Sequence, residues 1–173
     1  MRIHGFTLPE LLITLAITCI LLLASHPIGS LLTELHLTSS ARDLAATLRF
    51  ARSNAVLNQT GTTVLALDGS WSNGWQVFPD GNRNAQLDGD EATLIKRSTP
   101  LKLKISGNSP VATYIHYSAQ GTPELINGGF QAGSIYFCSP DSSLSPLKMT
   151  LSSTGRVRIE EQASADCRDA RGP

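Results

Sequence analysis

A long uncharged segment near the N-terminus constrains this chain more than any other feature. Between Leu11 and Thr33 there is no Asp, Glu, Lys or Arg, and residues 11–24 are mostly aliphatic. A helix of about 20 residues, covering 6–25, would be roughly 30 Å long, which matches the hydrocarbon core of a bilayer. We expect this helix to cross a membrane once. Arg2, on its short N-terminal side, predicts that this end stays in the cytoplasm.

One carboxylate, Glu10, lies near the start of the apolar segment. Such a group costs about 2.5 kcal/mol or more at the centre of a bilayer, unless it lies near the interface or has a cationic partner. The surrounding residues, Gly5-Phe6-Thr7-Leu8-Pro9-Glu10 followed by an aliphatic helix, closely resemble the leader and mature start of type IV pilins and type II secretion pseudopilins.

This resemblance implies how the N-terminus is processed. Prepilin peptidase would remove the leader, residues 1–5, by cutting after Gly5, and the new amine of Phe6 would be methylated. Glu10 would then pair with the N-terminal amine of a neighbouring subunit, which supplies the cation that this carboxylate otherwise lacks. The alternative interpretation is a plain signal anchor with an accidental Glu.

A second helical pattern follows the apolar segment, and it is amphipathic. Pro27 and Gly29 interrupt the helix between the two parts, because proline removes a backbone hydrogen bond and kinks the turn. Steps of three and four residues then place small and apolar side chains on one face, which we expect to lie on a folded head. These residues are Leu37, Ala41, Leu44, Leu48, Ala51 and Ala55.

Three arginines of this helix, Arg42, Arg49 and Arg52, fall at other angles around its axis. We interpret them as part of a solvated polar face, with packing against neighbouring subunits as the alternative. Asp43 is the only acidic residue between Leu35 and Leu67.

The rest of the chain predicts an antiparallel β-rich head. Short β-rich runs are separated by turn residues, and no second long helical pattern follows. The predicted fold is therefore α+β: a long N-terminal helix, transmembrane and then amphipathic, packed on the head. We divide the chain into a leader at 1–5, a transmembrane and assembly part at 6–29, an amphipathic part at 30–58, and a periplasmic head with a C-terminal tail at 59–173. The predicted strands are 62–67, 74–78, 93–97, 101–105, 112–117, 133–138, 148–151 and 157–159.

The head carries further resemblances. Trp71 and Trp75 flank a turn and are predicted to fill the core. The run Gly74-Trp75-Gln76-Val77-Phe78, a late Phe137-Cys138 and a Gly-Arg pair beyond them resemble the FimT, FimU and GspH group of minor pilins and pseudopilins. The resemblance covers essentially the whole chain.

Of the three cysteines, one lies in the apolar helix and two lie in the head and its tail. Cys19 lies in the apolar helix, where a free thiol behaves as a small apolar group. If the head is exported to an oxidising compartment, Cys138 and Cys167 can form a disulfide that closes a loop of about 30 residues. This bridge would tie the tail to the strand that ends at Cys138.

A Gly-Arg-x-Arg sequence, Gly155-Arg156-Val157-Arg158, is the main candidate site. In an extended strand Arg156 and Arg158 project to one face about 6.6 Å apart, which is comparable with the spacing of phosphates along a DNA strand. The sequence is similar to the C-terminal motif with which FimT-type minor pilins bind DNA in natural transformation. Arg168 and Arg171 could extend the patch. The alternative is a surface ion-pair ladder with Glu160, Glu161 and Asp166.

A second candidate site has calcium-loop spacing. Asp80, Asn82, Asn84, Asp88 and Glu91 occupy the first, third, fifth, ninth and twelfth positions of such a loop. However, Ala85 stands where the sharp turn requires glycine, and the flanking segments are predicted strands. We therefore favour a polar connection between strands and predict no metal site.

Catalysis and broad electrostatic binding are not expected. His116 has no cysteine nearby, and no nucleophile elbow, phosphate loop or metalloprotease helix is present, so we predict neither an enzyme nor a cofactor. Fourteen basic and fourteen acidic side chains balance, so a charge-based function must be local.

The sequence thus predicts a minor type IV pilin of the bacterial inner membrane, with a periplasmic head, which is later part of an extracellular pilus. Its predicted partners are prepilin peptidase, other major and minor pilin subunits through the N-terminal helix, and double-stranded DNA, bound weakly and without sequence preference. The alternative is a tip-priming subunit or a type II secretion minor pseudopilin without DNA affinity.

Overall fold

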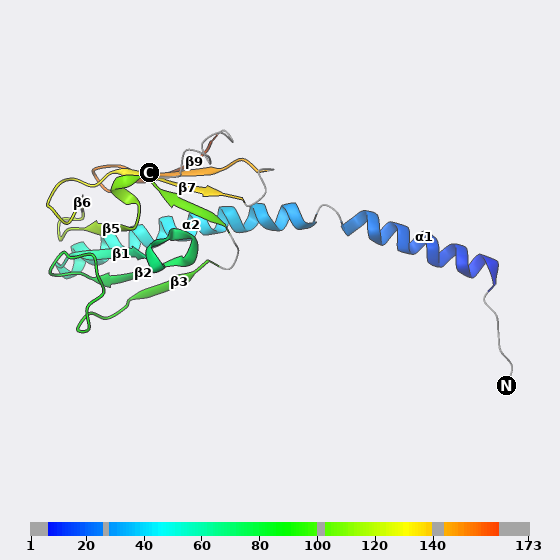
Figure 1. The fold of residues 1–173 in the computed structure, drawn as a ribbon, viewed down its shortest axis with the longest axis horizontal. Coiled ribbons are helices and arrows are strands. Elements are labelled where there is room, and N and C mark those ends of the chain that lie inside the picture. The colour runs from blue at the N-terminus through cyan, green and yellow to red at the C-terminus, as the bar shows by residue number, and fades with distance from the viewer. Residues whose placement is uncertain (1–6, 26–27, 100–102, 140–143, 163–173) are drawn as a thin grey trace. The chain divides into compact units, whose positions relative to one another are not determined.

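The computed structural model of the chain describes residues 7–25, 28–99, 103–139 and 144–162 (Figure 1). The chain divides into two compact units, Met1–Leu35 and His36–Pro173. Gly5, Phe6, Pro27, Cys167, Arg168 and Arg171, on which several of the predictions depend, lie outside the described residues.

The first unit contains helix α1, Leu8–Ser25, and the start of helix α2, Ile28–Asn58. Pro9 lies in the first turn of α1, where its missing N–H costs no hydrogen bond, and Glu10 in the same turn complements the helix dipole. The hydroxyls of Thr14 and Thr18 donate to backbone carbonyls within the helix, at 2.9–3.0 Å. Within the described parts of the chain, no helix has both the length and the apolar character needed to cross a bilayer.

The second unit is built on the C-terminal part of α2. Every residue of the predicted apolar face is buried, together with Ala45. These side chains form one core cluster with residues from both sheets, because a helix can bury an apolar stripe only against another element. Helix α2 ends at Asn58, and Gln59 follows with a φ of 53°, a left-handed conformation that commonly terminates helices.

Two antiparallel sheets complete the head (Figure 1). The first has the order β3-β2-β1-β5-β6 and the second the order β4-β7-β8-β9. The strands are β1 Thr62–Ala66, β2 Gly74–Pro79, β3 Ile95–Ser98, β4 Lys104–Gly107, β5 Tyr114–Tyr117, β6 Pro123–Glu124, β7 Gly133–Cys138, β8 Leu147–Leu151 and β9 Val157–Glu161. Short 3-10 turns lie at Leu67–Gly69, Trp71–Asn73 and Ser109–Val111.

The two tryptophans fill the core as predicted. Trp71 and Trp75 are 1% and 2% exposed. The indole N–H of Trp71 donates to the carbonyl of Val111 at 2.9 Å, and that of Trp75 donates to the hydroxyl of Thr47 at 3.2 Å. The second bond joins strand β2 to helix α2, so the polar edge of a buried aromatic side chain is satisfied.

The predicted α+β pilin fold is confirmed, and the differences are local. Strand β3 begins two residues later than predicted, and β4 runs from Lys104 to Gly107 where 101–105 was predicted. Strand β6, with only two residues, was not predicted because so short a segment has no periodicity.

Candidate nucleic-acid interface

The Gly-Arg-x-Arg sequence begins in a tight hairpin turn between β8 and β9. The N–H of Gly155 donates to the carbonyl of Ser152, and the N–H of Ser152 donates to the carbonyl of Arg156, both at 2.9 Å. Gly155 has a φ of 80°, which side-chain-bearing residues rarely adopt. The N–H of Arg156 also donates to the hydroxyl of Ser152 at 3.0 Å, so the turn fixes the backbone from which Arg156 projects.

A turn of the same construction lies in the other sheet, between β5 and β6. There the N–H of Gly121 donates to the carbonyl of Ser118 at 2.8 Å, and the N–H of Ser118 donates to the carbonyl of Thr122 at 2.9 Å. Gly121 has a φ of 76°. Thr122 thus holds the position in this turn that Arg156 holds in the other one.

Arg52 of helix α2 lies against both glycine turns. A Cβ built on Gly155 would come 3.3 Å from Cζ of Arg52, and one built on Gly121 would come 3.3 Å from Nε of Arg52. Arg52 is half-buried. Burial raises the pKa of the Tyr117 hydroxyl far above its usual value, and the positive charge of Arg52 acts in the opposite direction by lowering that pKa. The two glycines therefore leave room for the Arg52 side chain.

A groove of about 720 Å³ opens beside this contact. Arg49 and Arg52 line it from the helix, and Arg156 lines it from the β8–β9 turn. Arg49 and Arg156 are exposed, and so are the neighbouring apolar side chains Val56 and Leu57. No carboxylate of the described residues forms an ion pair with any of the three arginines. Within the described part of the chain, the groove therefore carries three positive charges that no carboxylate pairs with.

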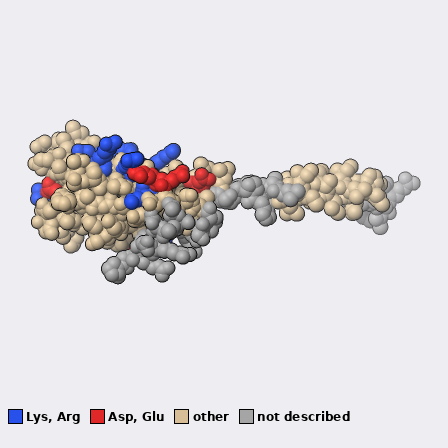
Figure 2. All heavy atoms as spheres, turned by 90° about the horizontal axis from the view of Figure 1, so that it is seen from above, with Lys and Arg blue, Asp and Glu red and all other residues tan. Residues whose placement is uncertain are grey.

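Arg158 has a different environment. It lies on β9 and projects away from Val157 and Ile159, as the alternating pattern predicts, because those two side chains pack against the core. Its guanidinium Nε lies 2.9 Å from the carboxylate of Glu160, two residues along the same strand face. The ion pair that was the alternative interpretation is thus present at Arg158 and absent, among the described residues, at Arg156. Basic and acidic side chains gather side by side on this face of the head (Figure 2).

The segment with calcium-loop spacing lies between β2 and β3, and its polar side chains bond to one another. The amides of Asn82 and Asn84 both donate to the Asp88 carboxylate, at 2.8 and 2.9 Å, and Glu91 accepts from the N–H of Asp88. Arg83 and Ala85 adopt positive φ values of 58° and 54°. In the described residues, no group of three or more His, Cys, Asp or Glu side chains is placed to hold a metal ion.

Asp80, the first residue of that loop, belongs to a buried network. The hydroxyl of Thr63 donates to the Asp80 carboxylate at 2.6 Å and lies 2.8 Å from Nδ1 of His116. The N–H groups of Asn84 and Ala85 also donate to Asp80. Although burial alone would raise the pKa of Asp80, the hydrogen bonds from His116, Thr63 and Ala85 lower it to about 2.

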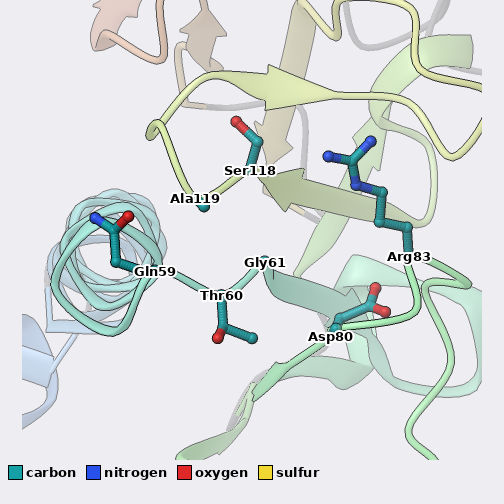
Figure 3. Close-up of a pocket in the computed structure, with 8 residues that line it drawn as sticks. Gln59, Thr60, Gly61, Asp80, Arg83, Ser118 and Ala119 are labelled. Carbon is teal, nitrogen blue, oxygen red and sulfur yellow. The ribbon is translucent and has the colours of Figure 1, made fainter.

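A small pocket of about 280 Å³ lies beside this network, at the end of α2 (Figure 3). Asp80 and Arg83 line one part of it, and Ser118 and Ala119 line another. Thr63 and His116 are completely buried, so no substrate could reach the hydroxyl or the imidazole. The network thus ties β1, the end of β2 and β5 together, and its role is structural.

The helical half of the groove was not predicted. The sequence predicts that Arg49 and Arg52 belong to a solvated polar face. It does not show that α2 lies beside the β8–β9 turn, because residue 155 is far from both arginines along the chain. One signal was available in the sequence: the two arginines are three residues apart, and therefore neighbours on the helix surface, in a segment with a single acidic residue. That residue, Asp43, pairs with Arg97 of β3, at 3.6 Å.

Comparisons with known proteins agree with this architecture. Residues 1–25 match the model of the prokaryotic N-terminal methylation motif, and residues 40–155 match the family described as type II transport protein GspH. A search of curated proteins found no match. Two crystal structures of the Pseudomonas aeruginosa (strain PAO1) type IV minor pilin FimU are similar in fold, with TM-scores of 0.56 and 0.55 and 24% sequence identity. They cover 76% and 74% of this chain, and 92% and 94% of their own.

The family model covers most of the described head, and the methylation motif covers the segment that contains Glu10. Membership implies processing by prepilin peptidase, assembly with other pilins, and a location first in the inner membrane and then in a pilus. These proteins are structural subunits and not enzymes. The chain belongs to the GspH family of type IV minor pilins and pseudopilins.

Proposed function

We propose that this minor pilin binds double-stranded DNA weakly and without sequence preference for uptake in natural transformation, through the turn and strand that carry Arg156 and Arg158. The observation that supports this most directly is the exposure of both side chains, Arg156 at the end of the β8–β9 turn and Arg158 on β9. Each guanidinium can form two parallel hydrogen bonds to phosphate oxygens. Arg168 and Arg171 of the C-terminal tail are proposed to extend the patch.

The binding should be weak. Two to four phosphate contacts supply only the range of non-specific binding, with a dissociation constant of about 10⁻⁴ to 10⁻⁶ M at physiological salt. Several copies, or several binding subunits in one filament, would raise the effective affinity without any new contact. A net charge of zero is compatible with this proposal, because a local cluster of arginines needs no excess of positive charge over the whole chain.

Fluorescence titration tests this proposal. Full-length protein in detergent would be titrated with a labelled DNA duplex at two salt concentrations, beside an Arg156→Gln/Arg158→Gln variant. The proposal predicts measurable binding that weakens with salt and is largely lost in the variant. Equal binding by the two proteins, or no binding by either, would exclude a DNA-binding role for this motif.

The N-terminal residues have proposed roles in processing and assembly. Cleavage would follow Gly5, methylation would occur on the amine of Phe6, and Glu10 would pair with that amine in a neighbouring subunit. The exposed position of Glu10 in the first turn of α1 supports the last role, because the carboxylate is accessible to another chain. In the proposed topology the N-terminus lies in the cytoplasm and the head in the periplasm.

A structural role in protein export, as a type II secretion minor pseudopilin or a tip-priming subunit, is the second candidate. The family description, type II transport protein, favours it. A deletion strain separates the two proposals: loss of secreted proteins with normal transformation supports export, whereas loss of DNA uptake with normal secretion supports DNA binding.

A further inference from the structure

Arg49, Arg52 and Arg156 line one groove of the head. Three arginines line it without an acidic partner among the described residues, although the whole chain is neutral. Three other arginines of the described head are paired, Arg83 with Glu124, Arg97 with Asp43 and Arg158 with Glu160, whereas Arg42 of α2 forms no ion pair with a described carboxylate. Gathering like charges is unfavourable, so such a groove is suited to an anion that supplies several charges at close spacing.

Arg52 is held in place before any ligand arrives. Its half-buried side chain lies against Gly121 and Gly155, one from each sheet, in turns with the same hydrogen-bond pattern. A Cβ on Gly121 would lie 2.8 Å from Val56, and one on Gly155 would lie 3.1 Å from the carbonyl oxygen of Gly121. Side chains at either position would therefore displace Arg52 or the turns. Ordering an arginine in advance reduces the entropy lost on binding.

Arg49 and Arg156 complete the arrangement from two directions. Arg49 lies one helical turn before Arg52, so both guanidinium groups leave the helix on the same side. Arg156 approaches from the β8–β9 turn, whose backbone is fixed by Ser152. The exposed side chains of Val56 and Leu57 border the same groove and offer an apolar surface to the sugar part of a nucleotide.

We infer that the anion-binding surface of this pilin is a groove formed by helix α2 and the β8–β9 turn, in which Arg49, Arg52 and Arg156 bind successive phosphates of one DNA strand. This inference rests on the proposed function and changes the set of residues that bind DNA. Arg158, paired with Glu160 on an exposed strand, contributes less than the two helical arginines. The glycine of the Gly-Arg sequence serves to make room for Arg52, in addition to forming the turn.

Single substitutions in the full-length protein test which arginines bind DNA. Arg49→Gln, Arg52→Gln and Arg156→Gln should each lower affinity for a DNA duplex about three- to tenfold, and each should reduce the salt slope by about 1. Arg158→Gln should change affinity by less than about twofold. Lys96→Gln on β3 is the matched control, because it removes the same charge from an exposed site away from the groove. Thermal unfolding would show that the Arg52 variant remains folded, and Arg52→Lys should recover part of the affinity.

The outcomes separate this inference from the proposed function. If the wild-type protein does not bind DNA, both fail. A second outcome is that the wild-type protein binds DNA, the Arg156/Arg158 double variant binds it more weakly, and Arg49→Gln and Arg52→Gln behave as Lys96→Gln does. In that case the proposed function stands and the groove is excluded as the binding surface. If the helical variants bind DNA normally but enter filaments poorly, the groove binds a neighbouring subunit, and the inference is overturned.

Discussion

The guanidinium carbon of Arg52 lies 3.3 Å from the position that a Cβ on Gly155 would occupy. Gly155→Ala should therefore be destabilising for two reasons, the φ of 80° and the collision with Arg52 and the carbonyl of Gly121. Gly128→Ala isolates the first reason, because Gly128 has a φ of 85° and open space around its missing Cβ.

We expect Gly128→Ala to cost about 1 kcal/mol of unfolding free energy, as a backbone penalty alone. Gly155→Ala should cost more and should also weaken DNA binding. Chemical denaturation and DNA titration of both variants measure these effects. Equal destabilisation, with unchanged DNA binding in both, would mean that Gly155 serves the turn alone.

The stability of the head should depend on pH through Asp80. The pKa of its carboxyl is lowered from the ordinary value of 3.8 to about 2 in the folded protein, so the ionised form stabilises the fold. This contribution, roughly 2 kcal/mol, is fully present above about pH 4 and is lost as the pH falls towards 2. Asp80→Asn should lower the free energy of unfolding at neutral pH by about 1 to 3 kcal/mol. It should also make this free energy less dependent on pH in the acid range. Denaturation curves between pH 2 and 7 measure both effects, with the exposed Asp68→Asn as control.

The proposed disulfide between Cys138 and Cys167 predicts a redox-dependent stability. Closing a loop of about 30 residues contributes roughly 3 to 4 kcal/mol on a chain-entropy model. A reducing agent, or Cys167→Ser, should lower the melting temperature by several degrees, whereas Cys19→Ser should not. Mass spectrometry of unreduced peptides would identify the bridge directly, and two free thiols at these positions in exported protein would refute it.

Processing at the methylation motif predicts the mass of the mature subunit. In protein isolated from its host, the chain should begin at Phe6 and carry one added methyl group. Gly5→Val should prevent cleavage and leave the chain at full length. A wild-type chain that still begins at Met1 would leave a plain signal anchor as the explanation.

Features that depend on local periodicity were predictable from the sequence. The buried face of α2 was found because steps of three and four residues place a stripe on one side of a helix, and all six predicted positions are buried. The strand at Gly133–Cys138 was predicted to the residue, since its β-rich run is bounded by turn residues. The two tryptophans were assigned to the core by size and context.

Features that depend on contacts between distant segments were not predictable. Arg52 and Gly155 are separated by some hundred residues, and nothing in either local sequence reveals that they meet. Asp80 was considered as a calcium ligand from its spacing to Asn82 and Asn84, yet one of its oxygens is committed to Thr63 and Ala85 inside the head. Arg156 and Arg158 looked equivalent in sequence, and the ion pair with Glu160 distinguishes them.

Protection of individual arginines by DNA tests the central claim most directly. Wild-type protein would be treated with phenylglyoxal, which modifies accessible guanidinium groups, with and without duplex DNA, and each arginine would be quantified by peptide mass spectrometry. We predict that DNA protects Arg49, Arg52 and Arg156 strongly, Arg158 weakly, and Arg83 and Arg97 not at all. Protection that is equal at every arginine, or that omits both helical residues, would contradict the groove as the DNA-binding surface.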